Sequence, residues 1–292
     1  MKKVLITGAT GQIGHRLCLS FSQQGFEVVG ISRKKPPVGN INTYKHITFD
    51  LMTDNIEMFL EYLRPQLLIH LAWETKPNIF WLSSTNYLWT QKSIELIKSF
   101  WHWGGEKIFV SGTCAEYDWR VTSELSETSA EFPETPYGKG KLNLLNFLRA
   151  ENAPFLWTRT FFQFGRSEMS GRLIPSLIDA FWRGDSFQID RPEDIRDFIY
   201  VDDVAEIMSA LIFSGVNGIF NVGSGEGIKV RDLALQIASK MDQHKLLKFR
   251  QQIEEQSVVK ADISKIRDTL RLFSLRSLDE ALEITIQERR PL

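Results

Sequence analysis

The stretch Lys3-Val-Leu-Ile-Thr-Gly-Ala-Thr-Gly-Gln-Ile-Gly14 decides how this chain of 292 residues folds. Its apolar part, Val4–Thr7, is typical of a short buried strand, and Gly8, Gly11 and Gly14 follow at once. Glycines in such a turn let a phosphate approach the backbone, and the next helix offers free N–H groups and the positive end of its dipole. The spacing is one residue longer than the common fingerprint, but the physical reason is unchanged. The stretch predicts a dinucleotide site, with a plain tight turn as the alternative.

Apolar strands alternate with amphipathic helices through the first half of the chain. The expected strands are Val4–Thr7, Phe26–Ile31, Ile47–Phe49, Leu67–Leu71, Lys107–Ser111 and Phe155–Thr160, and the expected helices are Gln12–Gln24, Ile56–Leu63, Ser84–Phe100 and Tyr137–Glu151. This alternation predicts the α/β class, with a Rossmann-type doubly wound parallel sheet covered by helices on both faces.

The rhythm loosens from about Phe161. The expected elements there are helices at Leu173–Arg183, Asp202–Phe213, Val230–Met241 and Ser277–Arg289 and strands at Phe198–Val201 and Ile219–Val222, with Asp202 as a helix cap. We expect residues 1–160 to form the dinucleotide-binding domain, with about 196–222 returning to it. Residues 161–292 are then expected to form a smaller α/β substrate-binding lobe.

The composition excludes several classes of protein. The net charge of −1 offers no basic field for nucleic acid. No apolar run approaches the roughly 18 residues of a membrane span, and no secretory segment is evident. The two cysteines suggest no disulfide framework, and the five histidines lack metal-ligand spacing. We therefore expect a cytoplasmic protein without a metal.

The end of the second strand indicates which cofactor is used. NAD would favour an acidic residue about 20 positions after the glycines, but the chain reads Ile31-Ser-Arg-Lys-Lys35. Ser32 and Arg33, assisted by Lys34, suit the 2′-phosphate of NADP; a solvated basic turn, with NAD as cofactor, is the alternative. Asp50 and Leu51 after the third strand are candidates for an adenine contact, although Asp50 is equally suited to cap a turn.

Tyr137 and Lys141 are one helical turn apart and share a helix face. A phenol with a pKa of about 10 is a poor base at neutral pH, and a nearby ammonium lowers that pKa. The pair can then exchange a proton with a substrate while hydride moves to or from a nicotinamide. Thr113, at the end of a strand, is placed to bind the same oxygen, unless it only satisfies backbone groups. The order of these motifs predicts a redox enzyme.

Seven stretches resemble the extended short-chain dehydrogenase/reductases, a group that contains nucleotide-sugar epimerases, dehydratases and ketoreductases. In chain order they are Gly8-Ala-Thr-Gly-Gln-Ile-Gly14, His70-Leu-Ala-Trp73, Asn86, Phe109-Val-Ser-Gly-Thr113 with Tyr117, Tyr137–Lys141, Arg196-Asp-Phe-Ile-Tyr-Val-Asp-Asp203 and Phe220-Asn-Val-Gly-Ser-Gly225. The resemblance runs nearly end to end, and the common order of the motifs makes it specific.

The resemblance implies a role for each matched residue. It implies that Thr113, Tyr137 and Lys141 are catalytic and that Lys141 also binds the nicotinamide ribose. The residues expected to bind the cofactor are Gly8, Thr10, Gly11, Gln12, Ile13, Gly14, Ser32, Arg33, Lys34, Asp50, Leu51, Leu71, Ala72, Trp73, Asn86 and Lys141. Arg196 corresponds to an arginine that contacts a substrate diphosphate, with a surface ion pair to Asp194 or Asp197 as the alternative. The helices Ser84–Phe100 and Tyr137–Glu151 are expected to form a homodimer interface.

Departures from the family pattern narrow the reaction. Sugar dehydratases place an acid and a base directly after the threonine, where this chain has Cys114-Ala115, and Glu116 is expected to be a surface or packing residue. Phe162 replaces an asparagine that normally touches substrate, and Gln163 is a candidate to compensate. The second phosphate-binding arginine, Arg250, is slightly out of register. The residues expected to bind substrate are Trp73, Thr113, Cys114, Tyr137, Gln163, Arg196 and Arg250.

Three hypotheses fit this sequence. The first is an NADPH-dependent 4-ketoreductase that acts on a nucleotide-activated deoxysugar. The second is a nucleotide-sugar 4-epimerase that retains a tightly bound NAD and uses the same Thr113, Tyr137 and Lys141. The third, from another class, is a catalytically idle NADP-binding sensor or interaction protein on the same fold.

Overall fold

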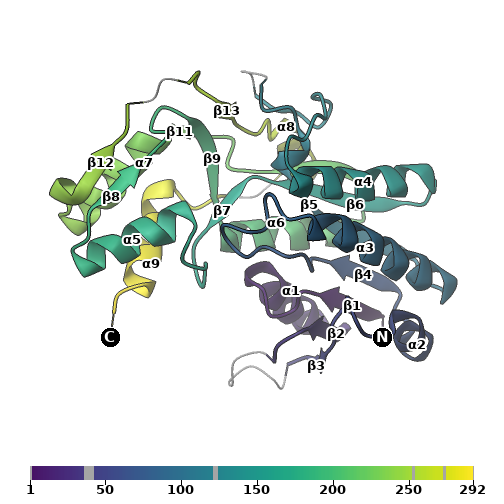
Figure 1. Cartoon of the computed structure of the whole chain (residues 1–292). Helices are drawn as coiled ribbons and strands as arrows, with labels where there is room; N and C mark the ends of the chain where they lie inside the picture. The colour runs from purple at the N-terminus through teal and green to yellow at the C-terminus, as the bar shows by residue number, and fades with distance from the viewer. Residues whose placement is uncertain (1, 36–42, 121–123, 252–253, 272–273, 292) are drawn as a thin grey trace.

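A seven-stranded parallel sheet forms the larger part of the molecule. The computed structural model describes residues 2–35, 43–120, 124–251, 254–271 and 274–291. The sheet has the order β10-β6-β5-β4-β1-β2-β3 (Figure 1). Its strands are β1 (Lys3–Thr7), β2 (Glu27–Ser32), β3 (Lys45–Thr48), β4 (Leu67–His70), β5 (Lys107–Thr113), β6 (Phe155–Thr160) and β10 (Gly218–Val222). All six pairings are parallel, which confirms the predicted fold class.

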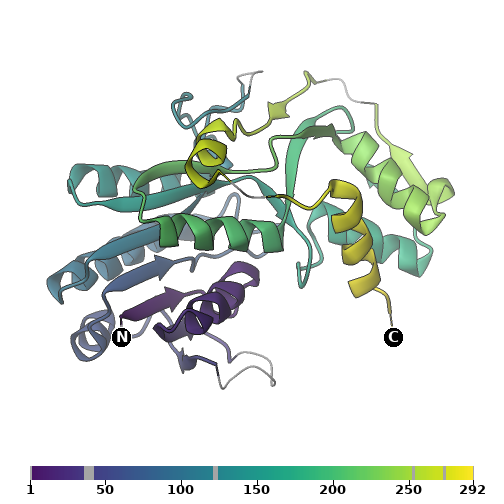
Figure 2. The same cartoon turned by 180° about the vertical axis from the view of Figure 1, so that it is seen from behind.

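Helices cover both faces of this sheet, because successive residues of a buried strand point to opposite sides. Val4 and Ile6 pack into one core with α1 (Gln12–Gln23) and α6 (Val201–Ser214). Leu5 packs into the other core, which α2 (Ile56–Leu63), α3 (Thr85–His102) and α4 (Pro136–Ala150) cover. Figure 1 has α3 and α4 in front, and Figure 2, from behind, brings α1 and α6 forward.

The smaller part is built around a second sheet with the order β11-β9-β13, in which β7 also pairs with β9. Its elements are β7 (Phe162–Phe164), α5 (Leu173–Arg183), β8 (Phe187–Ile189), β9 (Ile195–Tyr200), β11 (Gly227–Lys229), α7 (Val230–Met241), the short helix η2 (His244–Leu246), β12 (Leu247–Phe249), β13 (Val258–Val259) and α9 (Leu278–Glu288). The helix α8 (Ser264–Leu270) packs instead against β10 and α6 of the larger part. A separate core fills the space between α5, α7 and α9. Within the stretch 196–222, α6 and β10 pack on the first sheet, while β9 lies in the second.

The expected helices begin and end within two residues of the observed ones. The short strands β7, β8, β11, β12 and β13 and the helix α8 were not expected, because such brief segments lack a periodic pattern. The expectation that Asp202 caps α6 is wrong. Tyr200 is the N-cap residue and no side chain caps the helix; Asp202 lies within the first turn and forms an ion pair with Arg16 of α1.

Of the helices in the described ranges, none combines the length and the apolar character that crossing a membrane requires.

A buried ion pair lies beneath the end of β5. Glu116, in the short helix η1 (Cys114–Glu116), is fully buried and not on the surface. Its carboxylate accepts hydrogen bonds from Arg159 Nε at 2.8 Å, Trp157 Nε1 at 3.2 Å and the Thr113 N–H at 2.8 Å. Burial raises the pKa of Glu116, and the Arg159 guanidinium opposes that rise. Of the two roles expected for Glu116, a surface residue or a packing residue, the structure shows the second.

Replacement of Glu116 by Gln should lower the free energy of unfolding by about 3 kcal/mol, because it leaves the buried Arg159 guanidinium with much weaker compensation. Urea unfolding monitored by circular dichroism measures the change. Glu95→Gln is the matched control, since Glu95 pairs with Lys92 at a partly exposed site at 2.7 Å, and such a pair is worth no more than about 1 kcal/mol. Equal losses in the two variants would contradict a structural role for Glu116.

Candidate active site

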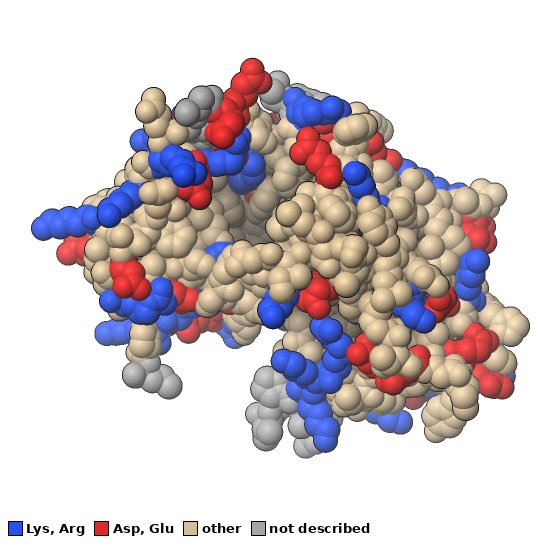
Figure 3. All heavy atoms as spheres, in the orientation of Figure 1, with Lys and Arg blue, Asp and Glu red and all other residues tan. Residues whose placement is uncertain are grey.

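A large cleft opens at the carboxyl ends of the parallel strands, where such sheets bind their ligands. Its volume is about 1120 Å³, and Figure 3 shows the molecule hollowed between its two parts. The expected site residues that line the cleft are Gly8, Thr10, Gly11, Gln12, Ile13, Gly14, Ser32, Arg33, Lys34, Asp50, Leu51, Leu71, Ala72, Trp73, Thr113, Cys114, Tyr137, Lys141 and Gln163.

The glycine turn has no room for side chains. Gly8 has a φ of 71°, and a Cβ at this position would lie 3.0 Å from Ala72 N. A Cβ on Gly14 would lie 2.2 Å from the Gly8 carbonyl oxygen. Gly11 is the N-cap residue of α1 and provides no side-chain cap, so the N–H groups of the first turn remain available to an anion in the cleft. The turn therefore fits the diphosphate of a dinucleotide.

A buried hydrogen-bond network joins the ends of β1 and β4. Thr7 Oγ1 accepts the N–H groups of Leu71 and Ala72 at 3.1 and 3.0 Å and lies 2.8 Å from His70 Nδ1. Burial lowers the pKa of His70 to about 3, so the ring is neutral. Because Thr7 Oγ1 already accepts two N–H groups, its proton goes to Nδ1, and His70 Nε2 donates to Ser93 at 2.8 Å. The network fixes the backbone of Leu71 and Ala72 along the cleft, a role for Thr7 that the sequence analysis missed.

Asn86 does not line the cleft, contrary to the expectation that it contacts the cofactor. It is buried in α3, where its Oδ1 accepts the Trp73 Nε1–H at 2.8 Å. Its Nδ2 donates to the carbonyl oxygens of Phe80 and Ser83 at 2.6 and 2.8 Å. With its side-chain hydrogen bonds made inside the protein, Asn86 orients Trp73, which does line the cleft.

Tyr137 lies in the first turn of α4, which Thr135 caps by accepting the Gly138 N–H at 3.1 Å. The rings of Phe80 and Trp81 pack edge-on against Tyr137, with centroids 5.0 and 5.4 Å away. Burial raises the pKa of Tyr137 to about 12, opposed by a hydrogen bond with Thr113 and by the charge of Arg172. The phenol is therefore protonated at neutral pH. It lies beside the Thr113 hydroxyl, which is the neighbour that the sequence predicted.

Lys141 is buried in α4, where its ammonium contacts β5 and Trp73. Its Nζ donates to the Ser111 carbonyl oxygen at 2.7 Å and lies 4.0 Å from the centroid of the Trp73 ring. Burial lowers the pKa of Lys141 to about 7, opposed by the charge of Glu116. The charge of Arg172 also lowers the pKa of Tyr137. The helix spacing places Lys141 one turn from Tyr137, and its effect on the phenol stays a prediction.

The basic segment after β2 lines the cleft. Ser32 Oγ donates to the Lys34 carbonyl oxygen at 2.7 Å and accepts from His46 Nε2 at 2.8 Å. Arg33 is half-exposed and lies 3.6 Å from the Glu74 carboxylate, after β4. Asp50 Oδ1 accepts the Met52 N–H at 3.0 Å, so this residue caps a turn and also lines the cleft.

The two arginines expected to bind substrate do not line the cleft. Arg196 donates to Asp194 Oδ2 and to the Ser257 carbonyl oxygen, both at 2.8 Å. The structure therefore has the ion pair with Asp194 that was the alternative to a substrate contact. Arg250 is exposed in the β8–β12 sheet region and lies 3.6 Å from Asp190. Cys114 does line the cleft, but burial raises its thiol pKa, which excludes a thiolate nucleophile.

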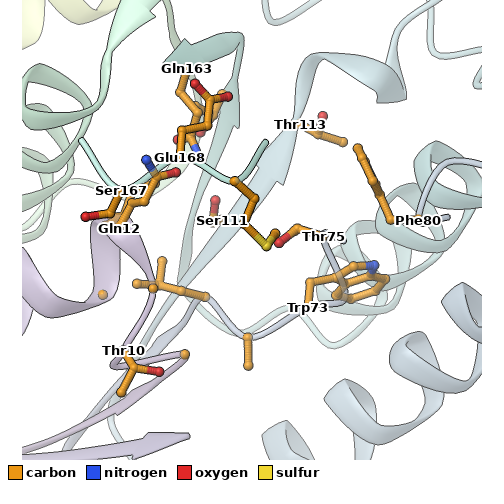
Figure 4. Close-up of a pocket in the computed structure, with 18 of the residues that line it drawn as sticks. Thr10, Gln12, Trp73, Thr75, Phe80, Ser111, Thr113, Gln163, Ser167 and Glu168 are labelled. Carbon is orange, nitrogen blue, oxygen red and sulfur yellow. The ribbon is translucent and has the colours of Figure 1, made fainter. Parts of the chain in front are cut away.

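The segment between β7 and α5 supplies charged groups that the sequence analysis missed. Glu168 and Arg172 both line the cleft, and Arg172 Nε lies 3.8 Å from Glu168 Oε1. Figure 4 shows Glu168, Gln163 and Ser167 on one side of the pocket and Thr113, Phe80 and Trp73 on the other. Burial raises the pKa of Glu168 to about 7, opposed by Arg172. The sequence offers no local signal for this pair, because its function depends on where an irregular loop folds.

No group of three or more His, Cys, Asp or Glu suited to a metal ion occurs among the described residues.

The fold and the cleft define a dinucleotide-dependent enzyme of the extended short-chain dehydrogenase/reductase type. A family model described as the NAD dependent epimerase/dehydratase family matches residues 4–223, and the chain belongs to that family.

Two curated relatives are similar over most of their length. The dTDP-4-dehydro-6-deoxyglucose reductase of Escherichia coli is 25% identical over 274 residues, which cover 86% of this chain and 85% of the relative. The dTDP-6-deoxy-L-talose 4-dehydrogenase (NAD(+)) of Aggregatibacter actinomycetemcomitans is 25% identical over 240 residues, or 78% of this chain and 86% of the relative. The solved UDP-glucose 4-epimerase of Thermotoga maritima superposes with a TM-score of 0.85 at 22% identity and covers 99% of this chain and 98% of its own, which shows the shared fold.

Proposed function

We propose that this enzyme is an NADPH-dependent 4-ketoreductase that acts on a nucleotide-activated deoxysugar. The observation that carries the proposal is the protonated Tyr137 phenol beside Thr113, because burial raises its pKa to about 12. A phenol that is protonated at neutral pH is in the state required to give a proton to a carbonyl oxygen, whereas it would first have to lose that proton to remove one from an alcohol. The residues after Thr113, Cys114 and Ala115, provide no acid and base for eliminating water. The similarity to a deoxysugar reductase over most of both chains also supports a reduction.

In this proposal each residue at the centre of the cleft has a separate role in the reduction. Thr113 donates a hydrogen bond to the substrate carbonyl oxygen, and Tyr137 gives that oxygen its phenolic proton as the carbonyl becomes an alcohol. The nicotinamide, when bound, supplies the hydride. The phenolate that remains on Tyr137 is stabilised by the charge of Arg172. The glycine turn holds the cofactor diphosphate, and the expected contact of Lys141 is the nicotinamide ribose.

NADP is the proposed cofactor because the segment after β2 carries Ser32, Arg33 and Lys34 and no carboxylate. All three residues line the cleft. A 2′-phosphate at this place meets two cations, whereas the 2′-hydroxyl of NAD meets no acidic partner in the segment.

Two measurements on the purified protein test this function. Denaturation and mass spectrometry identify any nucleotide that is carried along, and loss of absorbance at the NADPH band with dTDP-4-dehydro-6-deoxyglucose reports reduction. The proposal expects weak retention of nucleotide and consumption of NADPH by 4-keto sugar nucleotides. Stoichiometric, firmly retained NAD without consumption of NADPH would replace the reductase by the epimerase. Binding of NADPH with no turnover of any such sugar would favour the idle sensor.

Replacement of Tyr137 by Phe should lower kcat at least about 100-fold, because it removes the proton donor. The dissociation constant for NADPH should stay within about twofold of the wild-type value, since the phenol reacts with substrate. Stopped-flow or steady-state NADPH oxidation and fluorescence titration provide the two numbers. Undiminished turnover would end the assignment of Tyr137 as the acid.

Replacement of Arg33 by Ala should weaken NADPH binding about tenfold, roughly 1.4 kcal/mol, because a charge-assisted contact to the 2′-phosphate is lost. NADH lacks that phosphate and is the built-in control: its dissociation constant should change less than about twofold. Titration of both cofactors by protein fluorescence makes the comparison. Equal losses for the two would show that Arg33 does not read the phosphate.

We also propose a homodimer formed by α3 and α4. These helices pack against each other on one face of the sheet, and α3 exposes the large side chains of Tyr87 and Leu88. Light scattering at micromolar concentration should give twice the 33.7 kDa of one chain. A monomeric mass for the wild type would contradict this interface. So would a dimer that Tyr87→Lys leaves intact.

A further inference from the structure

The substrate side of the cleft has a loosely paired cation. Among the described lining residues of the segment 160–174, the cationic side chains are Arg166 and Arg172. Arg166 is held by Glu288 at 2.7 Å, whereas Arg172 lies 3.8 Å from Glu168. Arg172 also lies over the face of Phe80, 5.5 Å from the ring centroid, and its charge reaches Tyr137. Since Arg196 and Arg250 lie outside the lining, Arg172 is well placed to receive an anionic group of the substrate.

Glu168 is the partner that such a group would displace. Its side chain is only 5% exposed, yet its oxygens make few close contacts: the Gly165 N–H lies 3.4 Å from Oε2, and Arg172 lies 3.8 Å from Oε1. Two positive charges face it, Arg172 from the start of α5 and Arg289 from the end of α9. Arg289 is held by its own bonds to Asp179 and to the Glu168 carbonyl oxygen. Once Arg172 turns to an anion, the Glu168 carboxylate is left buried with little compensation.

We propose that substrate binding separates the Glu168–Arg172 pair: the substrate diphosphate takes the guanidinium, and Glu168 takes up one proton from solvent and becomes a neutral hydrogen-bond donor in the cleft. This inference rests on the proposed function, because it takes the substrate to carry a diphosphate. The balance is one proton gained by one carboxylate, with no bond broken in the substrate.

Protonation of Glu168 costs less free energy than leaving its carboxylate charged, buried and without a partner. A buried carboxylate without a partner costs several kcal/mol, and neutralisation avoids that cost. Burial already raises the pKa of Glu168 to about 7, so the proton is readily available near neutral pH.

An acceptor for the new O–H lies on the same side of the cleft. Among the described atoms, Gln163 Oε1 is buried and has no hydrogen-bond partner. Figure 4 shows Gln163 and Glu168 together on that side of the pocket. The neutral Glu168 can therefore donate a hydrogen bond to Gln163 Oε1 or to a sugar hydroxyl.

The sign of the pH dependence follows from this exchange. Above pH 7 Glu168 is charged in the free protein and must be protonated before the anion can take Arg172, so binding weakens as pH rises. Below pH 7 the proton is already present and affinity is level. If only the protonated form binds, affinity falls about tenfold between pH 6 and pH 8.

The test is isothermal titration of the full chain with dTDP-glucose and with UDP-glucose at pH 6 and pH 8. Both probes are diphosphate diesters that lack a 4-keto group, so they are not reduced and their charge is constant over this range. The expected wild-type result is a roughly tenfold weaker binding at pH 8 for the better probe. Repetition at pH 8 in HEPES and in Tris, which differ in ionisation enthalpy and offer no phosphate to compete for Arg172, should report uptake of about one proton.

Two variants assign the effect to this pair. Glu168→Gln, which is neutral at every pH, should bind at pH 8 as tightly as the wild type at pH 6 and take up no proton. Glu288→Gln removes the carboxylate of the neighbouring Arg166 pair and should keep the wild-type pH dependence. Near-UV circular dichroism confirms that each variant is folded, and the proton uptake of the wild type tests the idea even if a variant is not.

Three outcomes would overturn the proposal: neither probe binds the wild type, the wild type takes up no proton, or Glu168→Gln retains the tenfold pH effect. None of these depends on NADPH or on turnover. Proton-linked binding in a protein that reduces no 4-keto sugar would leave this inference standing and remove the reductase.

Discussion

The contact between α1 and the turn that precedes it constrains the whole nucleotide half. The Gly8 carbonyl oxygen lies so close to Gly14 that any Cβ there would come within 2.2 Å of it. That closeness fixes the start of α1 directly behind the end of β1 and aims the N–H groups of its first turn at the cleft. Gly8 also approaches the backbone of Ala72, so the same turn determines where the segment after β4 runs. Thr7 and His70 hold that segment by hydrogen bonds.

Burial shifts the pKa values of the groups at the centre of the site. Burial raises the pKa of Tyr137 to about 12 and lowers that of Lys141 to about 7, so both are shifted toward their neutral forms. A neutral phenol and an amine that is only partly protonated at neutral pH are less costly to bury than two ions. The arrangement keeps the proton on the donor until a substrate oxygen arrives, and the charge of Arg172 stabilises the phenolate that then forms.

The sequence predicted best what local patterns determine. The glycine spacing, the alternation of strands and helices and the Tyr137–Lys141 spacing each follow from a few neighbouring residues, and the structure brings them to one cleft. Roles that depend on distant partners could not be predicted in this way. Asn86 contributes to the cleft through its hydrogen bonds to Trp73 and Phe80, and Lys141 donates to a carbonyl group of β5, 30 residues away in the chain. The Glu168–Arg172 pair depends on the path of an irregular loop, which no periodicity describes.

Two aromatic rings flank Arg196, which does not line the cleft. Phe162 stands where the family pattern has an asparagine, and its ring lies 5.6 Å from the Arg196 guanidinium, while Trp119 lies 5.8 Å away. An amide at this position would offer a polar partner on the substrate side. An aromatic ring instead offers a surface for the cation to stack on and leaves its N–H groups to Asp194 and to the Ser257 carbonyl oxygen. Arg196 is thus engaged within the protein, while Arg172, in the loop before α5, lines the cleft.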